Sequence, residues 1–86
     1  MSGADVQIKV RLFTALRDAA GKEEVSLPWK RGMTYPDILG ELKKKFRPMV
    51  SLLECSFVAV NGGYAEPDQV LAPEDEVAVL PPVSGG

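Results

Sequence analysis

The side chains that usually carry catalysis are scarce in this sequence. The 86 residues include no histidine and a single cysteine, Cys55. Without histidine there is no Ser-His or Cys-His nucleophile pair and no HExxH zinc site, and one cysteine cannot build a structural zinc site. The sequence also has no GxxxxGK[ST] or GxGxxG loop for nucleotide phosphates. Any chemistry must therefore use an unusual reactive group, or a partner must supply the catalysis.

Length and composition predict one small globular domain. Hydrophobic residues make up 45% and charged residues 26%, a balance typical of folded rather than disordered chains. Ten Lys and Arg against twelve Asp and Glu give a net charge of -2, which does not favour nucleic acid as a partner. No apolar run approaches the roughly 20 residues of a membrane-spanning helix, and residues 1–7 lack the pattern of a secretory signal. We therefore expect a cytoplasmic protein without a membrane partner.

The first half of the chain predicts a hairpin followed by a helix. Apolar and polar residues alternate over 6–13 and again over 23–27, as in half-buried strands, and residues 16–21 form a turn or short helical link between them. A helix begins after Thr34, with Pro36 in its first turn and Asp37 at the capping-box position. Its apolar face comprises Ile38, Leu39, Leu42 and Phe46. We expect Pro48 to end this helix and residues 48–56 to form a crossing segment.

The second half predicts a return to the sheet. Residues 57–61 read as a strand, residues 64–70 as a short edge strand or extended loop, and residues 76–80 as the final strand. If the first and last strands lie parallel, the helix provides the crossover that this pairing needs. The expected fold is α+β: a ubiquitin-like β-grasp with a mixed sheet of four to five strands and one main helix across it. Residues 1–80 would form this domain, and residues 81–86 a flexible tail ending in diglycine.

Several stretches of the chain form a recognisable pattern: IKVRLF (8–13), Leu16-Arg17 with Gly21, the helix start at Thr34 with DIL (37–39), FVAVN (57–61), and Leu71 with EDEVAVLPPVSGG (74–86). Together these stretches resemble a known family, the small sulfur-carrying subunit of molybdopterin synthase, one of the ubiquitin-like sulfur carriers. The final run is the most specific of these, because it joins a strand, two prolines and a terminal diglycine. Residues 29–33 depart from the family pattern.

The resemblance implies that the reactive group is the end of the chain itself. The α-carboxylate of Gly86 would be adenylated with ATP and converted to a thiocarboxylate, with Gly85 keeping the tether thin. The thiocarboxylate would donate sulfur for the dithiolene of molybdopterin within the large synthase subunit, in a heterotetramer. The chain would thus be no enzyme on its own, and it would need no cofactor or metal. Its other partners would be an ATP-dependent adenylating enzyme and a sulfur donor protein.

The same resemblance implies which residues bind the partners. Phe13 and Leu80 lie on the strand face opposite the inward-pointing residues, and we expect both to be exposed and to form a docking patch. The tail residues expected to enter the partner are Pro81, Pro82, Val83 and Ser84. Alternative functions with the same diglycine end are sulfur carriers for thiamin, cysteine or tRNA thiolation, and a ubiquitin-like protein modifier. An inert binding module would tolerate the loss of Gly86.

Overall fold

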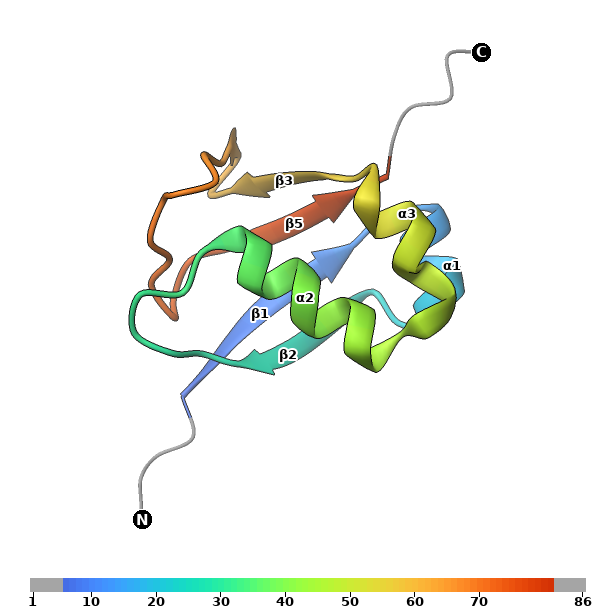
Figure 1. Cartoon of the computed structure of the whole chain (residues 1–86), viewed down its shortest axis with the longest axis horizontal. Helices are drawn as coiled ribbons and strands as arrows, with labels where there is room; N and C mark the ends of the chain where they lie inside the picture. Colours follow the sequence, from blue (N-terminus) through green and yellow to red (C-terminus); the bar gives the residue numbers. More distant parts are fainter. Residues whose placement is uncertain (1–5, 82–86) are drawn as a thin grey trace.

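Five strands and three helices form the part of the chain that the structure, a computed structural model, describes: residues 6–81 (Figure 1). In chain order the elements are β1 (Gln7–Leu12), α1 (Ala15–Ala20), β2 (Glu24–Pro28), α2 (Tyr35–Lys45), the 3-10 turn η1 (Arg47–Met49), α3 (Val50–Glu54), β3 (Phe57–Val60), β4 (Gly63–Tyr64) and β5 (Val77–Leu80). The expected strand–strand–helix–strand order is therefore confirmed.

The strands form one mixed sheet in the order β2-β1-β5-β3-β4. The hairpin β1–β2 is antiparallel, with Ile8 opposite Leu27, and β5 pairs antiparallel with β3. The first and last strands lie side by side and parallel, with Leu12 level with Val79. Together with α2, which packs across one side of the sheet, this arrangement confirms the predicted α+β, ubiquitin-like fold (Figure 1).

Helix α2 begins where the sequence predicts. The backbone N–H of Thr34 donates to the Asp37 carboxylate at 3.0 Å, so the capping box is formed and Pro36 lies in the first turn. Ile38 and Leu42 are fully buried against the sheet. The helix ends at Lys45, and its last turn carries three lysines, which the negative end of the helix dipole stabilises.

The segment after Pro48 differs from the prediction of a plain crossing segment. It contains η1 and the short helix α3, and these turns bury Met49 and Leu53 completely or almost so. Pro48 lies in the first turn of η1, a position where its missing N–H costs nothing. Proline therefore ends α2 and at the same time starts the next helical turn.

The core lies entirely between the sheet and the helices. The sixteen buried hydrophobic residues include the alternate positions of β1, namely Ile8, Val10 and Leu12. Among residues 6–81 no polar or charged residue is buried. Trp29 packs at the margin of this core, and its indole N–H donates to the carbonyl of Leu71 at 2.8 Å. That hydrogen bond joins the loop after β2 to the loop before β5.

Candidate functional site

The face of the sheet without helices exposes the other half of each strand. Along β1 the pattern alternates strictly, so Gln7, Lys9 and Arg11 are exposed while their neighbours are buried. On β5 the corresponding residues are Ala78 and Leu80, and both are half-buried. None of the helices within residues 6–81 packs there (Figure 1), so among these residues the helix-free face is open to a partner.

An apolar surface occupies the β5–β3–β4 part of this face. Phe57 lies opposite Leu80, Ala59 lies opposite Ala78, and Tyr64 of β4 lies on the other side of Ala59. The rings of Phe57 and Tyr64 meet edge to face with their centroids 6.2 Å apart. Phe57 and Tyr64 are 51% and 80% exposed, so together they form a contiguous exposed apolar surface, a feature that can mark an interaction site. With Phe13, the members of this apolar patch are Phe13, Phe57, Ala59, Tyr64, Ala78 and Leu80.

Phe13 and Leu80 lie on this face, but the expectation that both are exposed was wrong. Both are half-buried, because Leu80 packs beside Phe57 and the Arg11 guanidinium lies over the Phe13 ring, 6.0 Å from its centroid. Sequence reasoning missed the most exposed members, Phe57 and Tyr64. Phe57 could have been found, because it alternates with the inward Val58. Tyr64 had no comparable pattern around it, since β4 has only two residues.

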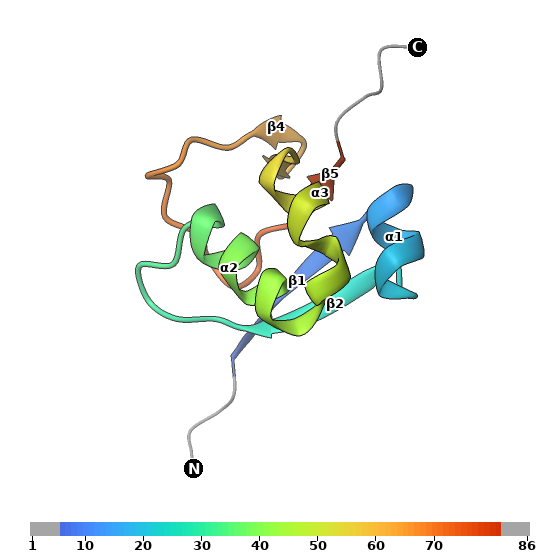
Figure 2. The ribbon, with the colours of Figure 1, turned by 45° about the vertical axis from the view of Figure 1, so that its right-hand side comes forward.

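The tail starts at the margin of the apolar patch. Leu80 is both a patch residue and the last residue of β5, and Pro81 follows it as the last described residue. Because β5 runs parallel to β1, the tail leaves from the end of the molecule where α1 and α3 lie (Figures 1 and 2). The expected site residues Pro82, Val83, Ser84, Gly85 and Gly86 lie outside the described residues.

A hydrogen-bonded turn fixes the start of β5. Asn61 adopts the left-handed conformation, φ 52°, and its side chain accepts from the Glu76 N–H at 2.9 Å and donates to Asp75 at 3.0 Å. Asp75 in turn accepts from the N–H of Ala72 at 2.8 Å. These hydrogen bonds hold the start of β5, the strand from which the sequence continues into residues 81–86.

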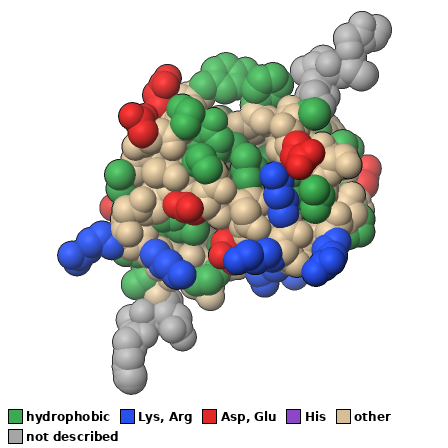
Figure 3. All heavy atoms as spheres, in the orientation of Figure 1, with side chains coloured by type: hydrophobic (Ala, Val, Ile, Leu, Met, Phe, Trp, Pro, Cys, Tyr) green, Lys and Arg blue, Asp and Glu red, His purple; other side chains and the backbone are tan. Residues whose placement is uncertain are grey.

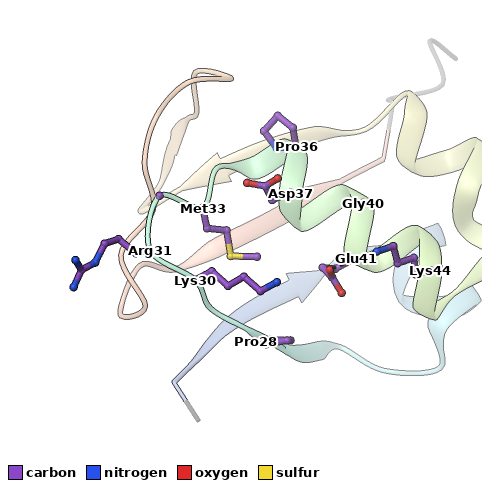
Figure 4. A pocket seen from close by; sticks show the side chains of 10 residues that line it. Pro28, Lys30, Arg31, Met33, Pro36, Asp37, Gly40, Glu41 and Lys44 are labelled. Carbon is purple, nitrogen blue, oxygen red and sulfur yellow. Dashed lines mark ion pairs between the residues drawn. The ribbon is translucent and has the colours of Figure 1, made fainter. Parts of the chain in front are cut away.

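On the helix side, a groove of about 550 Å³ lies between α2 and the loop before it (Figure 4). Its charges are mixed, since Lys44 lies 4.0 Å from Glu41 and Lys30 faces the same space, while Arg31 points away from α2. More widely, all ten Lys and Arg precede residue 48, and several of the basic side chains that are visible on the helix side lie along its lower edge in Figure 3. This groove lies on the layer opposite the apolar patch.

The described residues offer no metal site and no membrane span. No group of three or more His, Cys, Asp or Glu is placed to hold a metal ion within residues 6–81. Cys55 is exposed at the end of α3. No helix in the described region is long and apolar enough to cross a membrane.

Comparison with known proteins decides the family. The model of the ThiS family matches residues 10–86, which cover nearly all of the sheet, the helices and the tail. The chain belongs to the ThiS family. A curated relative, the molybdopterin synthase sulfur carrier subunit of Arabidopsis thaliana, is 34% identical over 83 residues, covering 96% of this chain and 86% of the relative.

Solved structures share the fold of this ThiS family member. A putative molybdopterin converting factor, subunit 1, from Pyrococcus furiosus is 31% identical with a TM-score of 0.79, covering 91% of this chain and 99% of that one. SAMP1 from Haloferax volcanii, a small archaeal modifier protein, is 27% identical with a TM-score of 0.80, covering 93% and 99%. A complex of subunits 1 and 2 of the molybdopterin-converting factor from Helicobacter pylori is similar in fold, at 20% identity and a TM-score of 0.65, covering 93% and 99%.

Proposed function

We propose that this protein is the sulfur carrier subunit of molybdopterin synthase. The observation that carries the proposal is the end of the central strand β5: Leu80, from which the sequence continues into residues 81–86, belongs to an apolar patch that the core does not use. A partner seated on this patch would hold the body at a fixed distance from the end of the chain. The names of the relative from Arabidopsis thaliana and of the structure from Pyrococcus furiosus support this choice within the family.

In the proposed reaction the terminal carboxylate becomes the sulfur donor. A carboxylate oxygen of Gly86 attacks the α-phosphate of ATP and displaces pyrophosphate, which gives an acyl-adenylate. Hydrosulfide (HS⁻) that the sulfur donor supplies then attacks the carbonyl carbon, loses its proton and displaces AMP, which leaves a thiocarboxylate whose sulfur builds the dithiolene of molybdopterin. Gly85 and Gly86 have no Cβ, so the reacting carbonyl remains accessible inside a narrow channel.

Each partner in this proposal has a separate role. The large subunit of the synthase docks on the apolar patch, receives residues 81–86 and supplies the acid and base groups, and the two chains assemble as a heterotetramer. An adenylating enzyme and a sulfur donor protein load the tail in the cytoplasm. Residues 81–86, fully extended, reach at most about 20 Å from the body, which sets the depth of the channel. In this proposal the chain delivers one reactive group, the thiocarboxylate of Gly86. It binds no nucleic acid, and it is no enzyme on its own.

Intact-mass measurement tests the chemistry. After incubation with ATP, the adenylating enzyme and a sulfur donor, the full chain should gain about 16 Da at its C-terminus, because sulfur replaces one carboxylate oxygen. A variant lacking Gly86 should gain nothing and should keep the thermal stability of the parent. It should also fail to transfer sulfur, since the reacting carbon is displaced by up to about 3.6 Å and 1 Å of misplacement can cost about 100-fold. Sulfur delivery at the native rate by this variant would refute the proposal.

A protein modifier is the second candidate function, favoured by the similarity to the archaeal modifier SAMP1. A modifier uses the same activated glycine, but the acyl group passes to a lysine of another protein. Immunoblots of cells expressing the tagged chain would then show a ladder of heavier adducts that disappears when Gly86 is deleted. A carrier for thiamin, cysteine or tRNA thiolation would instead gain sulfur but leave molybdopterin synthesis unchanged when removed.

A further inference from the structure

Arg11 lies on the helix-free face, at the border between its apolar and charged parts. In the sheet register Arg11 is level with Ala78 of β5 on one side and with Glu24 of β2 on the other. Ala78 belongs to the apolar patch, whereas Glu24 is exposed and acidic. Arg11 itself is exposed, so the helix-free face presents one guanidinium directly beside the apolar patch.

The guanidinium of Arg11 is directed toward the patch rather than toward the neighbouring acid. It lies 6.0 Å from the centroid of the Phe13 ring. Glu24 is its cross-strand neighbour, yet the ion pairs among residues 6–81 are Lys43–Glu54 and Lys44–Glu41, and Arg11 takes part in neither. The aromatic ring therefore orients the planar cation while its N–H donors remain available to a group outside the chain.

Acidic groups border Arg11 on the side away from Phe13. An open groove of about 430 Å³ runs from Gln7, Lys9, Arg11 and Glu24 to the turn that precedes β5. That turn contributes Glu74, Asp75 and Glu76, which leave the groove with more acids than bases. A partner carboxylate placed over this groove would be repelled, whereas one placed on the Phe13 side of Arg11 meets the guanidinium and an apolar surface.

We propose that Arg11 binds a carboxylate on the surface of the large subunit and thereby fixes how the carrier sits when its tail enters the channel. The inference rests on the proposed function, because it takes the large subunit as the protein seated on the apolar patch. A guanidinium binds a carboxylate through two parallel N–H bonds, and such a pair constrains orientation as well as distance. Hydrophobic contacts are non-directional, so on their own they constrain the orientation of the body less than such a pair does. Arg11 is thus a positioning residue that touches no reacting atom.

Matched variants on one strand test this role. Arg11→Gln and Lys9→Gln remove the same charge from the same exposed face of β1, two residues apart. Binding of each full chain to the purified large subunit is measured by calorimetry and by surface plasmon resonance. We expect Arg11→Gln to bind about 10- to 100-fold more weakly, mainly through faster dissociation, and Lys9→Gln to change the affinity less than about 2-fold.

A third variant separates geometry from charge. Arg11→Lys keeps the charge but loses the planar pair of donors, so we expect it to recover less than half of the lost binding free energy. In the sulfur-transfer assay with thiocarboxylated carrier, Arg11→Gln should raise KM while leaving kcat unchanged, because the tail and its reactive carbon are intact. Thermal unfolding should not move for any of the three variants.

The outcomes are distinct. Either of two results would overturn the assignment of Arg11. The first is an Arg11→Lys variant that binds the large subunit with the affinity of the parent chain, and the second is an Arg11→Gln variant that does so. A parent chain that does not bind the large subunit would instead overturn the proposed function itself. A charge-reversed Arg11→Glu carrier that recovers affinity only with a large subunit in which one surface Asp or Glu is replaced by Lys would support the pairing and identify the carboxylate.

Discussion

The two faces of the sheet are built from the same strands but differ in how far their side chains are buried. On the helix side, Val58, Val77 and Val79 are at most 5% exposed, and α2 and α3 cover them. On the other side, their immediate neighbours Phe57, Ala78 and Leu80 are only half covered or exposed. Because successive side chains of a strand point to opposite faces, one short sequence supplies both surfaces. The comparison shows that folding buries the helix side of the sheet, whereas the β5–β3–β4 part of the other face stays partly exposed as an apolar surface for a partner.

The difference between the faces predicts that stability and function can be changed separately. Substitutions on the helix side remove buried contacts and should lower the free energy of unfolding. Substitutions on the helix-free face should spare that free energy and weaken binding. A domain of this size has a free energy of unfolding of only about 5–15 kcal/mol. Substitutions of buried residues on the helix side can therefore unfold the protein, whereas substitutions on the helix-free face should leave it folded.

The largest effect on stability is expected from Leu42→Ala on α2. Leu42 is fully buried, so the change removes its packing and leaves a cavity, which typically costs about 2–5 kcal/mol. Lys44→Ala, two residues along the same helix, should change stability by less than about 0.5 kcal/mol, because Lys44 is exposed. Urea unfolding followed by circular dichroism measures both. Equal effects would contradict the assignment of Leu42 to the buried side of α2 and of Lys44 to its exposed side.

A smaller effect, on binding rather than on folding, is expected from Phe57→Ser. The ring is half exposed in the free chain, and a partner seated on the apolar patch would bury it, so the affinity for the large subunit should fall by about 2 kcal/mol. Val70→Ser is the matched control, since Val70 is 62% exposed but lies outside the patch. Leu80→Asp and Phe13→Ser should act like Phe57→Ser. Affinity that survives all three changes would exclude the apolar patch as the docking surface.

The smallest effect is expected from Trp29→Phe at the margin of the core. The phenylalanine keeps most of the ring packing but loses the hydrogen bond to the carbonyl of Leu71, which costs about 0.5–1.5 kcal/mol. The melting temperature should fall slightly while the affinity for the large subunit stays constant. A loss of affinity without a loss of stability would place Trp29 in the docking surface instead.

Most of the fold could be predicted from the sequence because its elements carry local patterns. The alternation in residues 6–13, the short apolar run within residues 76–80 and the Thr34–Asp37 capping box each indicate one element, and the order of these elements admits few topologies. Helix α3 was not predicted, because residues 48–56 were expected to form a plain crossing segment. It has five residues, too few for a helical period, and its stability comes from burying Leu53 under tertiary contacts.

Some residues of the candidate site could likewise be predicted from the sequence, and others could not. Phe13 and Leu80 could be placed on the helix-free face because each lies one residue beyond an inward side chain. Tyr64 could not, because it joins the face only through its pairing with Ala59 across a turn at Asn61 and Gly62. The position of Arg11 over Phe13 likewise depends on a side-chain conformation that no period in the sequence encodes.

The central place of β5 also has a mechanical consequence. The strand is bonded to β1 on one side and to β3 on the other, and the tail continues from its end. A force applied to the tail therefore loads both hydrogen-bond ladders in shear along the strand, so that many bonds must fail together rather than one after another. A partner that pulls on the tail would therefore work against the hydrogen bonds of β1 and of β3 at the same time.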